Sequence, residues 1–117
     1  MTRADRPGDP MSEAVFQILL ALSDQARHGL GIAADVESRT GGRVTLGAGT
    51  LYTALRRMRD DGWIRDAPAP AGRDDPRRRF YALTADGRRL RDAEARRLDA
   101  LLRDRRVRSI LRGKGPA

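Results

Sequence analysis

The residues best placed for chemistry in this sequence form a short cationic segment, residues 49–64, which contains a closing glycine at Gly62. At about 100° per residue, the apolar side chains of the segment share one stripe of an α-helix. That stripe consists of Leu51, Leu55 and Met58. Thr53, Arg56 and Arg57 are left for other contacts, and a guanidinium group presents paired donors that match the two acceptors of guanine in the major groove. The segment therefore predicts a DNA-recognition helix in which these three residues approach base edges.

The start of this helix adds backbone donors and hydroxyl groups. Gly47, Ala48 and Gly49 are small, so a phosphate can come close to the first amides of the helix. Unpaired N–H groups and the positive end of the helix dipole favour an anion at this position. The hydroxyl groups of Thr50 and Tyr52 complete a predicted clamp on the DNA backbone.

Two candidate strands follow the helix, at residues 63–67 and 78–83. The proline and glycine content of residues 68–77 between them excludes regular structure and predicts a hairpin with a long tip. Four arginines at this tip suit a phosphate ridge or a minor groove: Arg73, Arg77, Arg78 and Arg79. The hairpin is therefore predicted to be the wing of a DNA-binding domain, although Asp74 and Asp75 weaken its field.

The aromatic residues of the hairpin are assigned to packing. Trp63 stands at the junction of helix and strand and is predicted to fill the core. Alternation along the second strand predicts that Tyr81 and Leu83 face the core and that Phe80 is partly exposed.

Two more helices are expected before the recognition helix. The first opens at Pro10 and ends near Leu22, with one apolar side formed by Met11, Val15, Ile18, Leu19 and Leu22. The second begins at Gly29 and ends at the paired glycines Gly41 and Gly42. Its predicted apolar pattern is Leu30, Ala33, Ala34 and Val36, flanked by Ile32. Residues 43–46 are predicted to form a brief strand or an extended link.

From Thr84, a candidate N-cap, the chain is predicted to stay helical to about Arg112, a rod of roughly 40 Å. One broad side of this helix is apolar and contains Leu90, Ala93, Leu98, Ala100, Leu101 and Leu111. A single small domain does not need so long a last helix, so we interpret it as a dimerisation arm. Its arginines alternate with acids and are expected to form mostly a solvated, salt-bridged face.

Composition narrows the class of protein. The chain has 117 residues, a formal net charge of +8 and no cysteine, which favours a polyanionic partner and excludes disulfides and thiolate metal sites. The longest apolar run, residues 18–22, is too short for a membrane span, so a cytoplasmic protein without a membrane partner is expected. His28 is the only histidine and is interpreted as a helix-start or surface residue. With no catalytic motif, an enzyme, a metal site and a cofactor are not expected.

The order helix, helix, strand, helix, hairpin predicts a winged helix-turn-helix fold, mainly α with a small β-hairpin wing, followed by a long C-terminal dimerisation helix. In class terms this is an α+β fold. The predicted organisation is a disordered tail at 1–9, a DNA-binding domain at 10–83, the dimerisation helix at 84–112 and a tail at 113–117.

Several motifs stand in one order between Phe16 and Leu90. They are Ile18-Leu19-Leu20, His28-Gly29, Gly49-Thr50-Leu51-Tyr52 with Leu55, Gly62-Trp63-Ile64, and Arg79-Phe80-Tyr81-Ala82-Leu83-Thr84 followed by Gly87-Arg88. In these motifs the chain resembles the PadR-type transcriptional regulators. The resemblance implies a homodimeric repressor of the short form, with one C-terminal helix per subunit, which a small molecule releases from its operator.

In such a dimer, helix 1 is expected to pack beside the last helix of the partner. The residues predicted to line the dimer contact and a possible pocket for a small apolar or aromatic effector are Met11, Val15, Leu90, Leu98, Leu101 and Leu102. An alternative function stays open, in which the same winged-helix surface binds a protein or RNA partner without operator specificity. That alternative predicts poor discrimination among DNA sequences and a weak response to replacing Arg56, whereas operator reading predicts two half-sites about one helical turn apart.

Overall fold

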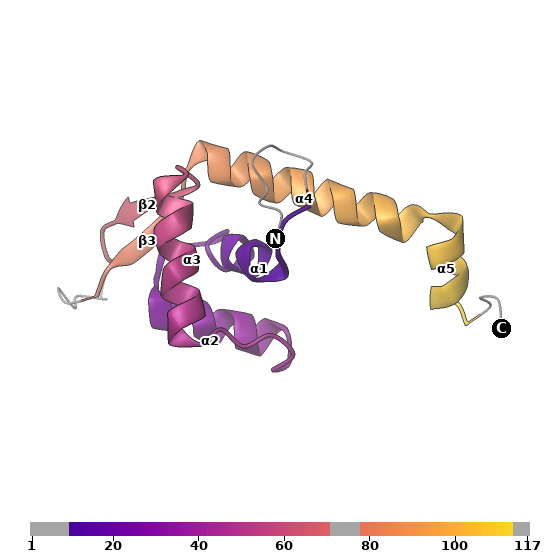
Figure 1. Cartoon of the computed structure of the whole chain (residues 1–117), viewed down its shortest axis with the longest axis horizontal. Helices are drawn as coiled ribbons and strands as arrows, with labels where there is room; N and C mark the ends of the chain where they lie inside the picture. The colour runs from indigo at the N-terminus through magenta and orange to yellow at the C-terminus, as the bar shows by residue number, and fades with distance from the viewer. Residues whose placement is uncertain (1–9, 71–77, 114–117) are drawn as a thin grey trace.

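The computed structural model describes residues 10–70 and 78–113. In chain order its elements are α1 (Glu13–Ala21), β1 (Arg27–His28), α2 (Gly29–Arg39), α3 (Ala48–Asp60), β2 (Ile64–Ala67), β3 (Phe80–Leu83), α4 (Ala85–Arg103) and α5 (Arg105–Leu111). Figure 1 shows α1, α2, α3 and the hairpin gathered into one body, from which α4 extends as an arm that ends in α5. The mainly α winged helix-turn-helix architecture is therefore confirmed. The predicted tail at 1–9 lies outside the described residues, and so does the tail predicted at 113–117 except for Gly113.

The strands form one antiparallel sheet in the order β1-β3-β2. The predicted hairpin is confirmed, with Ile64 opposite Leu83 in its register. Its third strand, β1, was not predicted, and it pairs with β3 through Arg27 opposite Tyr81. Residues 43–46 were predicted to be a brief strand or an extended link, and the structure excludes the strand: the segment is a bend followed by an irregular link. A two-residue strand has no sequence pattern of its own and exists because β3 offers it a free edge.

A side chain caps the N-terminus of each of the first two helices. Ser12 accepts a hydrogen bond from the backbone N–H of Val15 at 3.2 Å, and His28 accepts one through Nδ1 from the N–H of Gly31 at 3.0 Å. The predicted role of His28 at a helix start is therefore confirmed. Each bond satisfies an amide that the first helical turn leaves without a partner.

The buried face of α2 differs from the predicted one. Gly29, Ile32 and Val36 are buried, whereas Leu30 is 61 % exposed and Ala34 is exposed as well. Both sets are compatible with helical spacing, and the packing of α2 against α1 and α3 decided which one faces the core.

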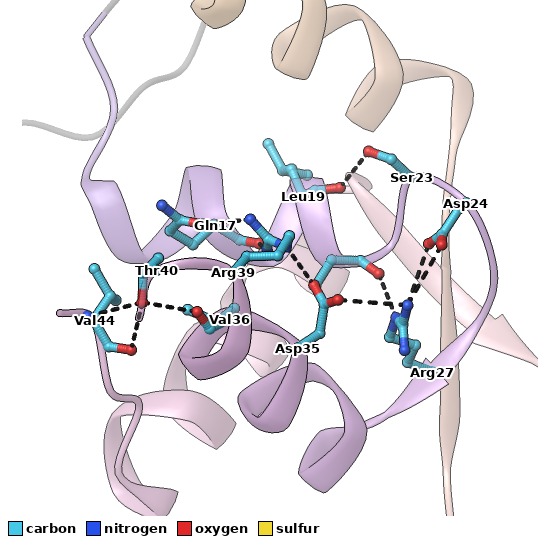
Figure 2. A network of polar contacts seen from close by, with 11 residues as sticks. Gln17, Leu19, Ser23, Asp24, Arg27, Asp35, Val36, Arg39, Thr40 and Val44 are labelled. Carbon is cyan, nitrogen blue, oxygen red and sulfur yellow. Dashed lines mark hydrogen bonds and ion pairs between the residues drawn. The ribbon is translucent and has the colours of Figure 1, made fainter. Parts of the chain in front are cut away.

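A network of charged side chains holds α2 against α1 (Figure 2). Asp35 on α2 pairs with Arg39 at 2.7 Å and with Arg27 at 3.6 Å. Arg39 donates to the side-chain oxygen of Gln17 on α1 at 2.9 Å, and Arg27 donates to the carbonyl oxygen of Ala21 at 2.7 Å. Through these contacts the helix that precedes the recognition helix is fixed to two other elements.

The core is formed by side chains from every part of the body and from the start of α4. Its buried hydrophobic residues are Ile18, Leu19, Ala21, Leu22, Ile32, Val36, Leu51, Leu55, Met58, Trp63, Ile64, Tyr81, Leu83 and Leu90. The inward placement of Trp63, Tyr81 and Leu83 is thus confirmed. Phe80, predicted to be partly exposed, is only 6 % exposed, because the ring of His28 covers it edge-on at 5.2 Å between centroids.

The arm is not the single rod that the sequence predicted. The helix breaks at Asp104, whose side chain accepts hydrogen bonds from the amides of Arg106 at 2.8 Å and Val107 at 3.3 Å. These bonds cap α5 and end α4 at the same residue, so α5 leaves the axis of α4 (Figure 1). Among the described helices, none has the length and apolar content needed to cross a bilayer.

Candidate nucleic-acid interface

Helix α3 has one buried and one exposed side, as predicted. Leu51, Leu55 and Met58 are 1 to 2 % exposed and fix the helix to the core. The residues predicted to contact DNA from this helix and from its start are all exposed: Gly47, Ala48, Gly49, Thr50, Tyr52, Thr53, Arg56 and Arg57. The apolar stripe therefore sets the rotation of α3, and that rotation points the arginine and hydroxyl groups outward.

The N-terminus of α3 has no side-chain cap. Gly47 stands at the N-cap position, and its carbonyl oxygen accepts the first helical hydrogen bond from the N–H of Leu51 at 2.9 Å. A Cβ added at Gly47 or Gly49 would meet nothing within 4 Å. The first amides of the helix are thus open to an approaching anion, which the helix dipole favours.

A cationic hollow of about 160 Å³ separates α3 from the wing strand β3. It is lined by Tyr52, Leu55, Arg56, Arg59, Arg79 and Tyr81. A second hollow continues it toward the start of α2 and shares Tyr52, Arg79 and Tyr81. The structure therefore brings the recognition helix and the wing together in one surface, where the two hollows are lined by four arginines and two phenol groups.

Arg59 belongs to this surface and was not among the predicted site residues. Its position follows Tyr52 by seven residues and Arg56 by three, a spacing that places all three on one side of a helix. Extending the predicted DNA-facing stripe along the helix would have found it from the sequence.

The structure describes two of the four predicted wing arginines. Arg78 and Arg79 are exposed. The guanidinium of Arg78 lies 3.3 Å from Nε2 of His28, and that of Arg79 lies 3.9 Å from the carboxylate of Asp66. Arg73 and Arg77, which were predicted to act with them, lie outside the described residues.

The residues predicted to form the dimer contact and the effector pocket differ in how exposed they are. Leu101 and Leu102 on α4 are 51 % and 54 % exposed, and Leu98 beside them is half-buried. Met11 and Val15 are half-buried against the hydrophobic core. Leu90 is only 5 % exposed and is itself part of that core, so it offers no free surface to a partner.

One buried carboxylate lies where α4 leaves the body. Glu94 is 3 % exposed, and its two oxygens accept hydrogen bonds of 2.8 Å from Nε and Nη2 of Arg97. These hydrogen bonds raise the pKa of Arg97 above its ordinary value, partial desolvation opposes the change, and the charge of Glu94 adds to it. The pair permits α4 to carry a carboxylate on its packed side. In the described ranges 10–70 and 78–113, no group of three histidine or acidic side chains is arranged to hold a metal ion.

Comparison with known proteins points to one family. The model of the transcriptional regulator PadR-like family matches residues 18–93. Among curated protein sequences, none matches the chain.

Solved structures with the same fold extend this result. RosR of H. salinarum is 26 % identical, with 91 % of each chain covered and a TM-score of 0.60. A PadR family transcription regulator from Clostridium difficile is 23 % identical, with 78 % of this chain and 95 % of that one covered and a TM-score of 0.62. PadR of Bacillus subtilis, solved in complex with operator DNA, is 22 % identical, with 83 % of this chain and 50 % of that one covered and a TM-score of 0.57.

Proposed function

The chain belongs to the PadR-like family of transcriptional regulators, and we propose that it is a repressor that binds a palindromic operator in double-stranded DNA as a homodimer and is released by a small molecule. It would act in the cytoplasm, associated with the nucleoid when bound to DNA. The observation that carries the proposal is the outward side of α3, where Thr53 and Arg56 are exposed beside the wing arginine Arg79.

This side of α3 has the chemistry of base reading. Arg56 can take the two acceptors of a guanine, and Thr53 can contact either base of a pair. The open amides at Gly47 and Gly49 and the hydroxyl groups of Thr50 and Tyr52 would hold the phosphate backbone. The operator DNA bound by the B. subtilis protein is a precedent for this use of the fold.

The arm supports a homodimer. Four of the exposed large apolar side chains lie on its outer part: Leu101, Leu102, Ile110 and Leu111. Exposed apolar side chains on a helix that extends from the body are stabilised when a second copy covers them. Two recognition helices related by a two-fold axis would then meet half-sites about one helical turn apart.

An effector site would lie between the subunits. Met11 and Val15 of one subunit and Leu98, Leu101 and Leu102 of the other would surround an apolar space that suits a small apolar or aromatic molecule. Such a molecule releases the protein only if it binds more tightly to a dimer whose recognition helices do not fit the operator, because equal affinity for both forms shifts no equilibrium.

Selection of genomic DNA fragments by the purified protein tests this function. The best fragment is then titrated at two salt concentrations with the wild type, Arg56→Ala and Arg96→Ala. Arg96 is exposed on the side of α4 opposite to Leu98, so its replacement removes the same charge without touching α3 or the proposed dimer face. We expect a palindrome, an affinity that falls steeply with salt, and a preference that relaxes only in Arg56→Ala, by about 10-fold or more.

If no motif emerges and Arg56→Ala binds as the wild type does, α3 does not read bases. The result would then favour the use of this surface for a protein or RNA partner.

A further inference from the structure

One carboxylate contacts two arginines of the cationic surface that the wing and the recognition helix share. Asp66 on β2 is 58 % exposed, and its Oδ1 atom lies 3.4 Å from Nη1 of Arg59 on α3 and 3.9 Å from Nε of Arg79 before β3. A single oxygen atom therefore bridges the two walls of the hollow. In the register of the sheet, Asp66 is opposite Tyr81, so the side chains of both residues and of Ile64 lie on the face of the hairpin that packs against α3.

The hollow suits one phosphate group. Its volume of about 160 Å³ exceeds that of a few water molecules, and its charged lining is cationic. Arg59 and Arg79 present guanidinium groups from opposite walls, and Tyr52 contributes a hydroxyl donor. The carboxylate of Asp66 contacts both of these arginines, as a phosphate oxygen of a bound DNA would do.

We propose that Asp66 is a built-in competitor for phosphate, which lowers the affinity of this surface for DNA in general and thereby raises its selectivity. The inference rests on the proposed function, since it assumes that DNA approaches α3 and the wing. Any DNA must displace Asp66 from Arg59 and Arg79 before its phosphate can use both arginines. At a random sequence the phosphate contacts are nearly the whole of the binding free energy, so this competition has its largest effect there. At an operator the base contacts of α3 add to the binding and offset it.

The test compares Asp66→Asn with Asp24→Asn. Asp24 is exposed in the turn between α1 and β1 and lies 3.4 Å from Arg27, an arginine that does not line the hollow. Both substitutions raise the net charge by one, so a general charge effect moves both variants equally. Binding to a duplex of random sequence is measured at several salt concentrations, and thermal melting confirms that both variants are folded.

For Asp66→Asn we expect random DNA to bind about 3- to 10-fold more tightly than for the wild type and for Asp24→Asn, with a salt dependence steeper by up to about one released ion. The operator recovered in the selection experiment should gain less, so the ratio of operator to random affinity should fall. Inorganic phosphate should compete with random DNA at lower concentration for Asp66→Asn than for the wild type.

Weaker binding of Asp66→Asn to both DNAs would overturn the proposal and make Asp66 a residue that positions the arginines. Equal gains for Asp66→Asn and Asp24→Asn would also overturn it, because the effect would then be one of net charge. A wild-type protein that binds no duplex at low salt would contradict the proposed function itself, a result that differs from either of these.

Discussion

The hydroxyl oxygen of Tyr52 on the recognition helix lies where a side chain at Gly29 would begin. An ideal Cβ built at Gly29 would be 2.5 Å from that oxygen, far inside the contact distance. The first residue of α2 must therefore lack a side chain so that Tyr52 can lie across it, at the border of the two hollows. The contact joins the two helices of the helix-turn-helix on the side that is proposed to face DNA.

Gly29→Ala should leave the protein folded and weaken its binding to DNA. Tyr52 is 44 % exposed, so its side chain can move away, and alanine is favoured over glycine in a helix. The free energy of unfolding should therefore stay within about 1 kcal/mol of the wild type. The displaced hydroxyl group would lose its predicted contact with the DNA backbone. The affinity for the selected operator should therefore fall about 3- to 10-fold. Gly31→Ala is the control, because a Cβ there would lie 3.5 Å from the His28 ring, an ordinary contact. Equal affinity of the two variants would show that Tyr52 needs no fixed position.

Gly87→Ala should destabilise the fold strongly. A Cβ at Gly87 would lie 2.1 Å from the carbonyl oxygen of Trp63, and backbone cannot turn aside as a flexible side chain can. The start of α4 would have to move off the turn that follows α3, at a cost of about 2–3 kcal/mol. Urea unfolding at one fixed protein concentration measures this, since the stability of the proposed dimer would depend on concentration. Gly49→Ala, where a Cβ meets nothing within 4 Å, should lose no stability, and a similar loss in both variants would refute the explanation.

Thr84→Ala should lower the free energy of unfolding by about 1–2 kcal/mol. The hydroxyl of Thr84 donates to the carbonyl oxygen of Gly62 at 2.6 Å and accepts from the N–H of Gly87 at 3.0 Å. One side chain thus caps α4 and ties it to the glycine turn that ends α3. Thr84→Ser keeps the hydroxyl group and should retain most of the stability. A serine variant as unstable as the alanine variant would assign the effect to the lost methyl group instead.

Leu101→Asp should separate the proposed dimer. Leu101 is 51 % exposed in the described subunit, so a carboxylate there costs little in the monomer but would be desolvated against a second arm. Sedimentation equilibrium should give a dissociation constant at least about 30-fold higher, the size expected for an interface hot spot. Arg96→Asp introduces the same group on the opposite side of α4 and should leave association unchanged. Monomeric wild type, or a dimer that tolerates Leu101→Asp, would place the interface elsewhere.

The sequence determined the elements whose pattern is local. Leu51, Leu55 and Met58 recur at helical spacing within 13 residues of α3, and this spacing was enough to predict both the helix and its outward side with Thr53 and Arg56. Alternation along the second strand likewise assigned Tyr81 and Leu83 to the core, and the place of Trp63 at the junction of helix and strand assigned it there as well. The cationic face and the family resemblance followed from these same positions.

Only the tertiary structure decided features that depend on distant parts of the chain. The strand β1 forms because β3, more than fifty residues later, leaves an edge for Arg27 and His28. Leu30 was predicted to belong to the apolar pattern of α2 and Ile32 to flank it, but the packing of the helix against α1 and α3 buries Ile32 and exposes Leu30. Asp104 fits the polar side of a continuous helix, and its use as a cap that breaks the arm was not visible in the spacing. Asp66 on β2 contacts Arg59 on α3 and Arg79 before β3, which come from separate parts of the chain. A local sequence pattern predicts which side of an element is buried, but not which other element packs against it.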